Sequence, residues 1–242
     1  IMHLGRNNQQ FEYVMNGRTL DTVVQEKDVG VIVHNSLKPS AQCAKAAKKA
    51  NQVLGQLARA VTYRNKETFV RLYAMYVRPH LDYLAMSWSP WTIVDKEILE
   101  KGQKRAIKMV SGLRGRIYEE KLKEVNLTTL EERRIRGDMI EVYKILTDKE
   151  DVSPGTWFTM ANEGRLGTGT RHTDGLLNIK KNEASHDLRR NFFSVRVCEL
   201  WNSLDSYVKE APSTNAFKNR YDEFINSTNH LLVLISVTKL FL

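Results

Sequence analysis

The chain has 242 residues and a formal net charge of +9, with 42% hydrophobic and 27% charged residues. This length allows one large domain or two small ones, and the composition excludes a chain that is disordered throughout. The basic balance favours a polyanionic partner, either nucleic acid or an anionic membrane surface. Two cysteines, Cys43 and Cys198, exclude a disulfide framework and a four-cysteine zinc site. We therefore expect buried free thiols and an intracellular protein of the cytoplasm or nucleus.

The two ends of the sequence differ from targeting and membrane-spanning segments. The start, Ile1-Met2-His3-Leu4-Gly5, has no basic-then-apolar run of the kind that a secretory signal needs. Because the sequence does not begin with methionine, we expect a fragment of a longer chain. The apolar tail 231–242 is shorter than the about 20 residues of a membrane span. We expect it to form a terminal strand or helix, or to be off-frame sequence, and we expect no membrane partner.

Residues 1–37 are predicted to form a small antiparallel sheet. The dipeptide Asn16-Gly17 lies between two β-prone runs and is typical of a two-residue hairpin turn. The segment Lys27–Val33 is predicted as a third strand, with one face formed by Val29, Val31 and Val33. Three short strands are marginal alone, so we expect the edge of something larger.

Residues 38–147 have helical periodicity. After Pro39, apolar residues recur at three- and four-residue steps at Cys43, Ala47, Ala50, Leu54, Leu57, Ala58 and Val61. Asn65 is expected to cap a second helix that Pro79 ends or kinks, with an apolar stripe of Phe69, Leu72, Tyr73, Tyr76 and Val77. Capping boxes at Thr92/Asp95 and Thr128/Glu131 predict two more helices, and a short helix is expected over Tyr118–Val125.

The rest of the chain divides into a glycine- and threonine-rich loop segment at 148–187, C-terminal helices at 188–226 and the apolar tail 227–242. The predicted fold class is therefore mainly α, with a small N-terminal antiparallel sheet, a helical bundle and a loop-rich C-terminal region.

Motifs for chemistry are missing. The glycines Gly164, Gly167 and Gly169 follow no predicted strand, so we do not expect a phosphate-binding loop there. The six histidines lack metal-ligand spacing, and Arg171, His172 and Asp174 read as exposed loop residues. A two-metal nucleotidyl transfer site needs paired carboxylates, whereas the candidates are isolated at Asp21, Asp28, Asp82 and Asp95. We expect Asp82 to serve a turn or cap, and we assign no catalytic residue, metal site or cofactor to this chain.

The segment Lys38–Arg78 holds nine basic residues against Glu67 alone, a net charge of +8. The simplest interpretation is an ordinary solvated face, but surface helices usually mix both signs of charge. We therefore predict phosphate contacts at Lys45, Lys48, Lys49, Arg59, Arg64, Lys66 and Arg71. Trp88 and Trp91 are candidate exposed stacking residues, whereas Tyr73 and Tyr76 are expected in the core.

An ordered series of motifs over roughly residues 1–225 resembles the jockey-like branch of LINE (non-LTR) retrotransposon reverse transcriptases. The motifs are Met2-His-Leu-Gly-Arg-Asn-Asn8, Glu26-Lys-Asp-Val-Gly-Val-Ile-Val33, Ser36-Leu-Lys-Pro-Ser40, Tyr76-Val-Arg-Pro-His-Leu-Asp-Tyr83, Trp88-Ser-Pro-Trp91, Leu99-Glu-Lys-Gly-Gln-Lys-Arg-Ala106, Leu127-Thr-Thr-Leu-Glu-Glu-Arg-Arg134, Phe192-Phe-Ser-Val-Arg196 and Trp201-Asn-Ser203. The chain departs from the family at Asp205, where the family tends to have proline.

The resemblance implies the region after the polymerase palm: the last palm strands at 1–37, a thumb-like domain at 38–147 and the C-terminal part of an RNA-directed DNA polymerase. The family's Phe-x-Asp-Asp strand and endonuclease domain lie upstream, so Mg²⁺ is expected only for that palm. The implied partners are an RNA–DNA or DNA duplex and the upstream palm and endonuclease domains. Two alternatives are a nucleic-acid-binding module retained by a host protein and an inactive relic without a biochemical role.

Overall fold

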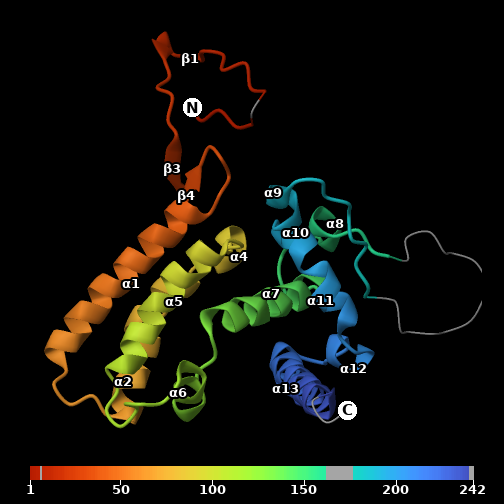
Figure 1. Ribbon diagram of the computed structural model, residues 1–242. Coiled ribbons are helices and arrows are strands. Elements are labelled where there is room, and N and C mark those ends of the chain that lie inside the picture. Colours follow the sequence, from red (N-terminus) through yellow and green to blue (C-terminus); the bar gives the residue numbers. More distant parts are fainter. Residues whose placement is uncertain (6, 162–176, 240–242) are drawn as a thin grey trace, which may run out of the picture. The chain divides into compact units, whose positions relative to one another are not determined.

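A computed structural model describes residues 1–5, 7–161 and 177–239, and the side chains up to residue 228. The chain divides into two compact units, Ile1–Ile135 and Arg136–Leu242. It is mainly helical, with two small two-stranded antiparallel sheets near the N-terminus (Figure 1). This confirms the predicted fold class in its coarse form. The glycines Gly164–Gly169 and the group Arg171, His172 and Asp174 lie outside the described residues.

The first hairpin is where the Asn-Gly signal predicts it. Strands β1 (Val14–Met15) and β2 (Arg18–Thr19) pair across Asn16 and Gly17, both of which have positive φ, 52° and 73°. A turn with two positive φ values matches the right-handed twist of the strands it connects. Each strand has two residues, and all four are exposed.

The prediction of one strand over Lys27–Val33 is wrong. The segment contains a second hairpin, in which β3 (Gln25–Asp28) pairs with β4 (Val31–His34) around Val29 and Gly30. Both turn residues have positive φ, 43° and 86°, which glycine adopts freely and valine does not. Val29 is therefore 71% exposed at the turn, and only Val31 of the predicted apolar face is buried.

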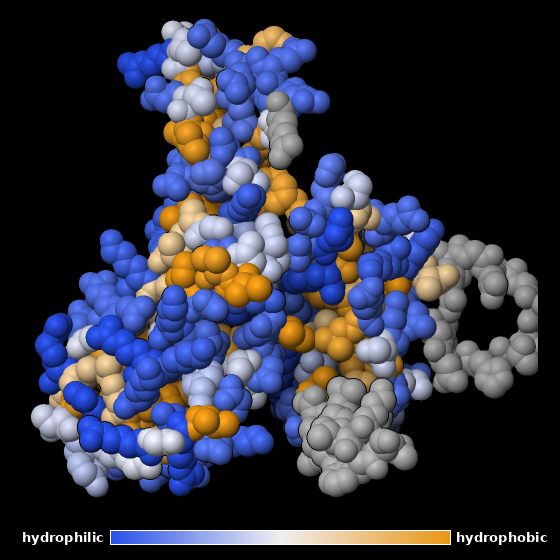
Figure 2. All heavy atoms as spheres, in the orientation of Figure 1, coloured by the Kyte–Doolittle hydropathy of each residue, from blue (hydrophilic) through white to orange (hydrophobic). Residues whose placement is uncertain are grey.

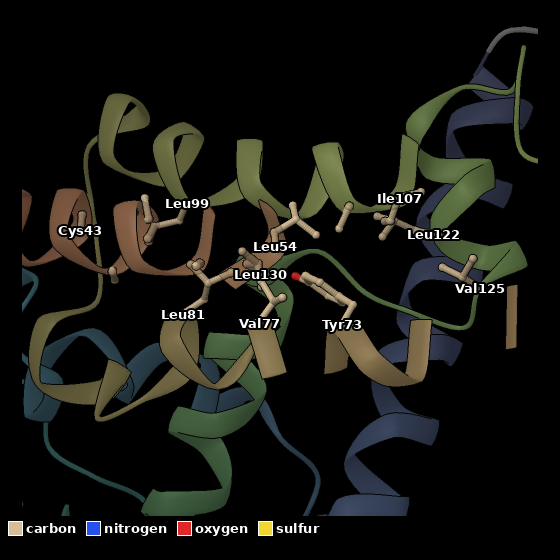
Figure 3. Close-up of a cluster of buried hydrophobic side chains, with 14 of the residues drawn as sticks. Cys43, Leu54, Tyr73, Val77, Leu81, Leu99, Ile107, Leu122, Val125 and Leu130 are labelled. Carbon is tan, nitrogen blue, oxygen red and sulfur yellow. The ribbon is translucent and has the colours of Figure 1, made fainter. Parts of the chain in front are cut away.

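The core of unit 1 lies between α1 (Ser40–Ala60) and α5 (Ile93–Lys108). Leu54 of α1 and Leu99 and Ile107 of α5 are completely or almost completely buried, and they lie among Tyr73, Val77 and Leu81 (Figure 3). The predicted stripe of α1 is confirmed at Cys43, Ala47, Ala50 and Leu54. Cys43 and Cys198 are free and buried, as expected.

The second predicted helix continues into a widened turn. Asn65 accepts a hydrogen bond from the Thr68 amide and so caps α2 (Lys66–Leu72), as predicted. A π-helix, η1 (Tyr73–Val77), and a short α3 (Pro79–Asp82) follow. The buried positions are then four residues apart, at Phe69, Tyr73, Val77 and Leu81. Tyr76 was predicted in the core, but it is 54% exposed because the wider π turn keeps Tyr73 and Val77 on the inner face.

Unit 1 is completed by α4 (Ala85–Trp88), α6 (Tyr118–Glu124) and the start of α7 (Leu130–Leu146). The capping box of α7 lies one residue later than predicted. Thr129 accepts from the Glu132 amide while Glu132 accepts from the Thr129 amide. Glu131, the predicted partner, forms an ion pair with Lys96 instead. Both frames fit the Thr-x-x-Glu pattern, and the tertiary contact of Glu131 selects between them.

A polar network inside unit 1 joins four of its elements. The Tyr73 hydroxyl donates to Gln103 Oε1 at 2.9 Å, and Gln103 Nε2 donates to the Thr128 carbonyl at 2.9 Å. The Glu100 carboxylate accepts from the Tyr118 hydroxyl and, at 3.0 Å, from the Leu130 amide at the N-terminus of α7. Burial raises the pKa of Tyr118, and the hydrogen bond to Glu100 raises it further. Glu100 therefore positions α6 and α7 against α5.

Unit 2 contains the rest of α7 and a series of mostly short helices. These are α8 (Pro154–Trp157), α9 (Asp187–Arg190), α10 (Phe193–Arg196), α11 (Cys198–Ser203), α12 (Ser206–Lys209) and α13 (Thr214–Lys239). Helix α13 covers most of the tail that was predicted as a strand or helix. An isolated antiparallel bridge pairs Met160 with Ile179, both of which lie in the loop segment 148–187.

Aromatic stacking and paired charges hold unit 2 together. The rings of Tyr143 and Phe217 lie 4.5 Å apart between centroids and nearly parallel, and Trp201 lies 6.0 Å from Phe217. On α7, Arg136 binds both carboxylate oxygens of Asp222, at 2.6 and 2.8 Å. Two-point arginine–carboxylate contacts fix geometry better than single ones. Asp138 is buried and accepts two hydrogen bonds from Arg196, at 2.9 Å each.

Replacing Glu100 with alanine should lower the free energy of unfolding by about 2–3 kcal/mol, because the Leu130 amide and the Tyr118 hydroxyl lose their acceptor. Glu97, one turn earlier on α5, is exposed. The Glu97→Ala variant should therefore unfold within about 0.5 kcal/mol of wild type. Urea unfolding followed by circular dichroism measures both, and equal values for the two variants would contradict the role of Glu100.

The Cys43 thiol should resist alkylation in the folded chain. Burial, with a smaller contribution from the negative charge of Asp95, raises the pKa of this thiol to about 12. Burial also raises the pKa of the Cys198 thiol. Iodoacetamide at about pH 8 should therefore label neither residue quickly, and it should label both after unfolding in guanidinium chloride. Because the folded pKa of Cys43 lies above its ordinary value of 9.0, its contribution to stability is full below that pH and declines as the pH rises towards 12.

Candidate nucleic-acid interface

Helices α1 and α5 begin at a shared carboxylate. Asp95 is 3% exposed, and its Oδ2 accepts hydrogen bonds at 2.8 Å from the hydroxyls of Ser40 and Thr92. Ser40 is the first residue of α1, and Thr92 caps α5, where its hydroxyl accepts from the Asp95 amide. A carboxylate is favourable at helix N-termini, where unpaired amides carry partial positive charge. The predicted box at Thr92/Asp95 is thus confirmed as a cap, and its acid also holds α1.

The two helices run parallel and side by side from this point (Figure 1). Asn51, about three turns into α1, accepts a hydrogen bond from Arg105 Nη1 on α5 at 3.5 Å. A Cβ on Gly102 would lie 4.0 Å from the Asn51 side chain, which confirms the close approach there. Ser40 and Asp95 are 55 positions apart in the sequence, and Asn51 and Arg105 are 54 apart. The residues of each pair are nevertheless neighbours in the fold.

This arrangement brings exposed cations of both helices to one surface. Lys48 lies one turn before Asn51 on α1, and Arg59 lies on the same outward row. Lys101 and Lys108 flank Arg105 at one-turn spacing on α5. We call this set the α1–α5 basic face; its members are Lys48, Arg59, Lys101, Arg105 and Lys108, all exposed. Helix α1 contains no acidic residue, and Figure 2 shows many hydrophilic residues in the region of the two helices.

Four of the predicted phosphate contacts make contacts within the chain. Lys45 Nζ donates to the Gly30 carbonyl of the second hairpin at 2.7 Å. Arg64 donates to the carbonyls of Ala58 and Val61, at 2.6 and 3.2 Å, and so closes the C-terminal end of α1. Two ion pairs occupy the others, Lys66 with Glu124 at 2.8 Å and Arg71 with Glu67 at 3.6 Å.

Lys48, Lys49 and Arg59 are the predicted contacts that point outward from α1. All three are exposed, and within the described part of the chain no ion pair or side-chain hydrogen bond engages them. Lys49 lies one turn after Lys45, on the side of α1 that faces the second hairpin, so it is separate from the α1–α5 basic face.

The expectation that Trp88 is an exposed stacking residue is wrong. Its side chain is 4% exposed, belongs to the core of unit 1 and donates from Nε1 to the Tyr83 carbonyl at 2.9 Å. The short helix α4 follows Leu84, whose φ of 48° reverses the chain and turns the indole inward. Trp91 is half-buried. Stacking by this pair would have to rest on Trp91.

Sequence reasoning gave too little weight to α5. Its exposed Lys101, Arg105 and Lys108 share the helix with Asp95, Glu97 and Glu100, so composition alone gives the helix a mixed charge. Glu100, however, is engaged in the internal network, and Asp95 is buried at the junction with α1. The exposed surface of α5 is therefore more basic than the composition of the helix indicates. Helical spacing predicts that its lysines face outward, but it does not predict that two of its acids are used internally.

Asp82 was expected to serve a turn or cap, and the structure instead gives it ion pairs. It lies at the end of α3 and forms an ion pair with Arg133 at 2.6 Å. Among the residues that the structure describes, no three His, Cys, Asp or Glu side chains are grouped in a way that could hold a metal ion. Within the same residues, no helix combines the length and apolar character that crossing a membrane requires.

Comparisons with protein-family models, with curated proteins and with solved structures find no match to this chain. The geometry of the α1–α5 basic face is therefore the observation on which a functional proposal rests.

Variants of Arg64 and Arg59 should distinguish a basic residue that stabilises the fold from one that only lies on the surface. Arg64→Met should lower the free energy of unfolding by about 1–2 kcal/mol, because it removes both hydrogen bonds that close α1. Arg59→Met, at the exposed end of the same helix, should change it by less than about 0.5 kcal/mol. Chemical denaturation of the two variants measures the difference, and a larger loss for Arg59→Met would contradict the assignment.

Proposed function

We propose that this chain binds a nucleic-acid duplex through the α1–α5 basic face. The observation that carries the proposal is the convergence of five exposed cations from two parallel helices, with no acid on α1. Like charges on adjacent helices repel each other, and a polyanion removes that repulsion. Lysine and arginine placed this way contact phosphates and do not read base sequence.

We further propose that the chain is the thumb and C-terminal part of a retrotransposon-type RNA-directed DNA polymerase, with residues 1–37 as a palm edge. The motif series supports this reading, as does the apolar surface of the first hairpin. Phe11, Tyr13, Val14 and Met15 are each more than half exposed. The duplex would be the template–primer, and the catalytic carboxylates and their Mg²⁺ would belong to the upstream palm.

The same observations bear on the two alternatives. A module retained by a host protein would use the same basic face without a palm. A relic without a role would leave the same apolar hairpin exposed, and its basic helices would bind nothing. Duplex binding therefore separates the first two interpretations from the third.

The full chain should bind a short RNA–DNA duplex with a log–log salt slope of about −4 to −5, because about five phosphates are neutralised. Lys48→Glu with Lys101→Glu should weaken binding at least about tenfold near 0.1 M salt and reduce the slope by about 2. The matched control is Lys27→Glu with Lys123→Glu, which changes the net charge equally at exposed positions on β3 and α6.

Fluorescence anisotropy at several salt concentrations measures these affinities. Control binding close to wild type, with loss confined to the Lys48 and Lys101 variant, supports the face as the contact. A flat salt response would exclude the polymerase fragment and the host module together. Equal losses in both variants would show that net charge, and not this face, determines binding.

A further inference from the structure

Unit 2 carries an exposed aromatic ring next to a buried one. Phe192, between α9 and α10, is 47% exposed, whereas Phe193 is 3% exposed. The ring of Trp157 on α8 lies nearly parallel to Phe192, at 12°, with 6.4 Å between centroids. The same indole meets Phe193 edge-on at 5.8 Å. The exposed ring is therefore held in place by aromatic contacts that continue into the core (the aromatic cluster of Trp157, Phe192 and Phe193).

The surroundings of Phe192 contain charges of both signs. The guanidinium carbon of Arg189 lies 5.3 Å from the Phe192 ring centroid, and Arg189 is exposed. Arg190 is fixed by hydrogen bonds to the carbonyls of Ala184 and Ser185, at 3.2 Å each. Arg190 also forms an ion pair with Asp187 at 3.3 Å. It lines an open pocket of about 690 Å³ with Lys181, which pairs with Glu199, and with residues 182–185. These two bases are therefore used within the chain, whereas Arg189 is available to a ligand.

A second exposed ring in unit 2 has the same contact but different surroundings. Tyr207 is 62% exposed, and the guanidinium carbon of Arg220 lies 3.9 Å from its centroid. Arg220 also donates to the Tyr207 carbonyl at 2.5 Å, which uses this arginine within the chain. Exposed Asp205 and Glu210 flank Tyr207. An arginine over a ring is therefore not enough to make a binding site, and Arg189 differs in that no hydrogen bond or ion pair uses its guanidinium within the described residues.

We propose that Phe192 and Arg189 bind single-stranded nucleic acid. An unpaired base stacks on the exposed part of the Phe192 ring, and Arg189 contacts an adjacent phosphate. Stacking on an aromatic side chain tolerates every base, because each has a π face. Paired bases in a duplex are already stacked on one another, so this site takes an unpaired strand. All of its residues belong to unit 2, and it does not depend on the α1–α5 basic face.

The test uses the full chain and a labelled oligothymidylate of about twelve residues, with an oligouridylate of equal length as the RNA arm. Phe192→Leu keeps an apolar side chain but removes the ring, and it should weaken single-strand binding about tenfold. Tyr207→Leu is the matched control and should bind as wild type does. Arg189→Gln should reduce the salt slope by about 0.7, the value for one phosphate contact on a single strand.

Circular dichroism of each variant establishes that the fold is kept, and Arg189→Gln tests the site without altering the ring stack. Wild-type affinity of Phe192→Leu for both oligonucleotides would overturn the proposal, as would equal losses in Phe192→Leu and Tyr207→Leu. If Phe192→Leu weakens binding of only one of the two oligonucleotides, the site is specific for DNA or for RNA accordingly. Phe192→Leu should leave the affinity for the duplex unchanged. The single-strand proposal and the proposal for the α1–α5 basic face can therefore fail independently of each other.

Discussion

The buried carboxylate of Asp95 is the constraint on which unit 1 depends. It binds the first residue of α1 and the cap of α5 together, so the two helices start at one place and run in one direction. Parallel neighbouring helices place their dipoles unfavourably side by side, and their positive ends converge. A shared anion at that end offsets this cost. At the other end, Arg64 supplies a cation to the last carbonyls of α1, and its own carbonyl accepts from the Ser111 amide just after α5.

The parallel pairing also explains how the basic residues divide into two groups. Bases at the edges of α1 and after its end are held by carbonyls or carboxylates of neighbouring elements, as Lys45, Arg64 and Lys66 are. Bases on the outward side have no such neighbours, because the exposed α5 residues that flank Arg105 at one-turn spacing are Lys101 and Lys108. Lys48 and Arg105 face the same solvent for this reason. A composition count adds both groups together, whereas only the outward group is available to a ligand.

Local signals in the sequence predicted local structure well. The Asn16-Gly17 turn, the Asn65 cap and the start of a helix after Pro39 depend on neighbouring residues, and each is confirmed. The errors occurred where distant contacts decide the outcome. The Thr129 frame of the α7 cap is selected because Glu131 pairs with Lys96. The inward orientation of Trp88 depends on a positive φ at Leu84, and a leucine in the sequence does not predict a positive φ. The π turn, which exposes Tyr76, has no simple sequence signature.

The same limit applies to the sites. The outward lysines of α1 were predictable because helical spacing alone places them opposite an apolar stripe. The contribution of α5 required knowing that Asp95 and Glu100 are used internally, and this depends on contacts with α1 and α7. The Phe192 site required the same kind of knowledge, since sequence spacing does not distinguish Phe192 from the buried Phe193. The two surfaces also differ physically: one gains affinity from phosphate charge and the other mainly from a ring. Salt therefore weakens the first more than the second, and a chain that used both would hold an unpaired strand under conditions that release a duplex.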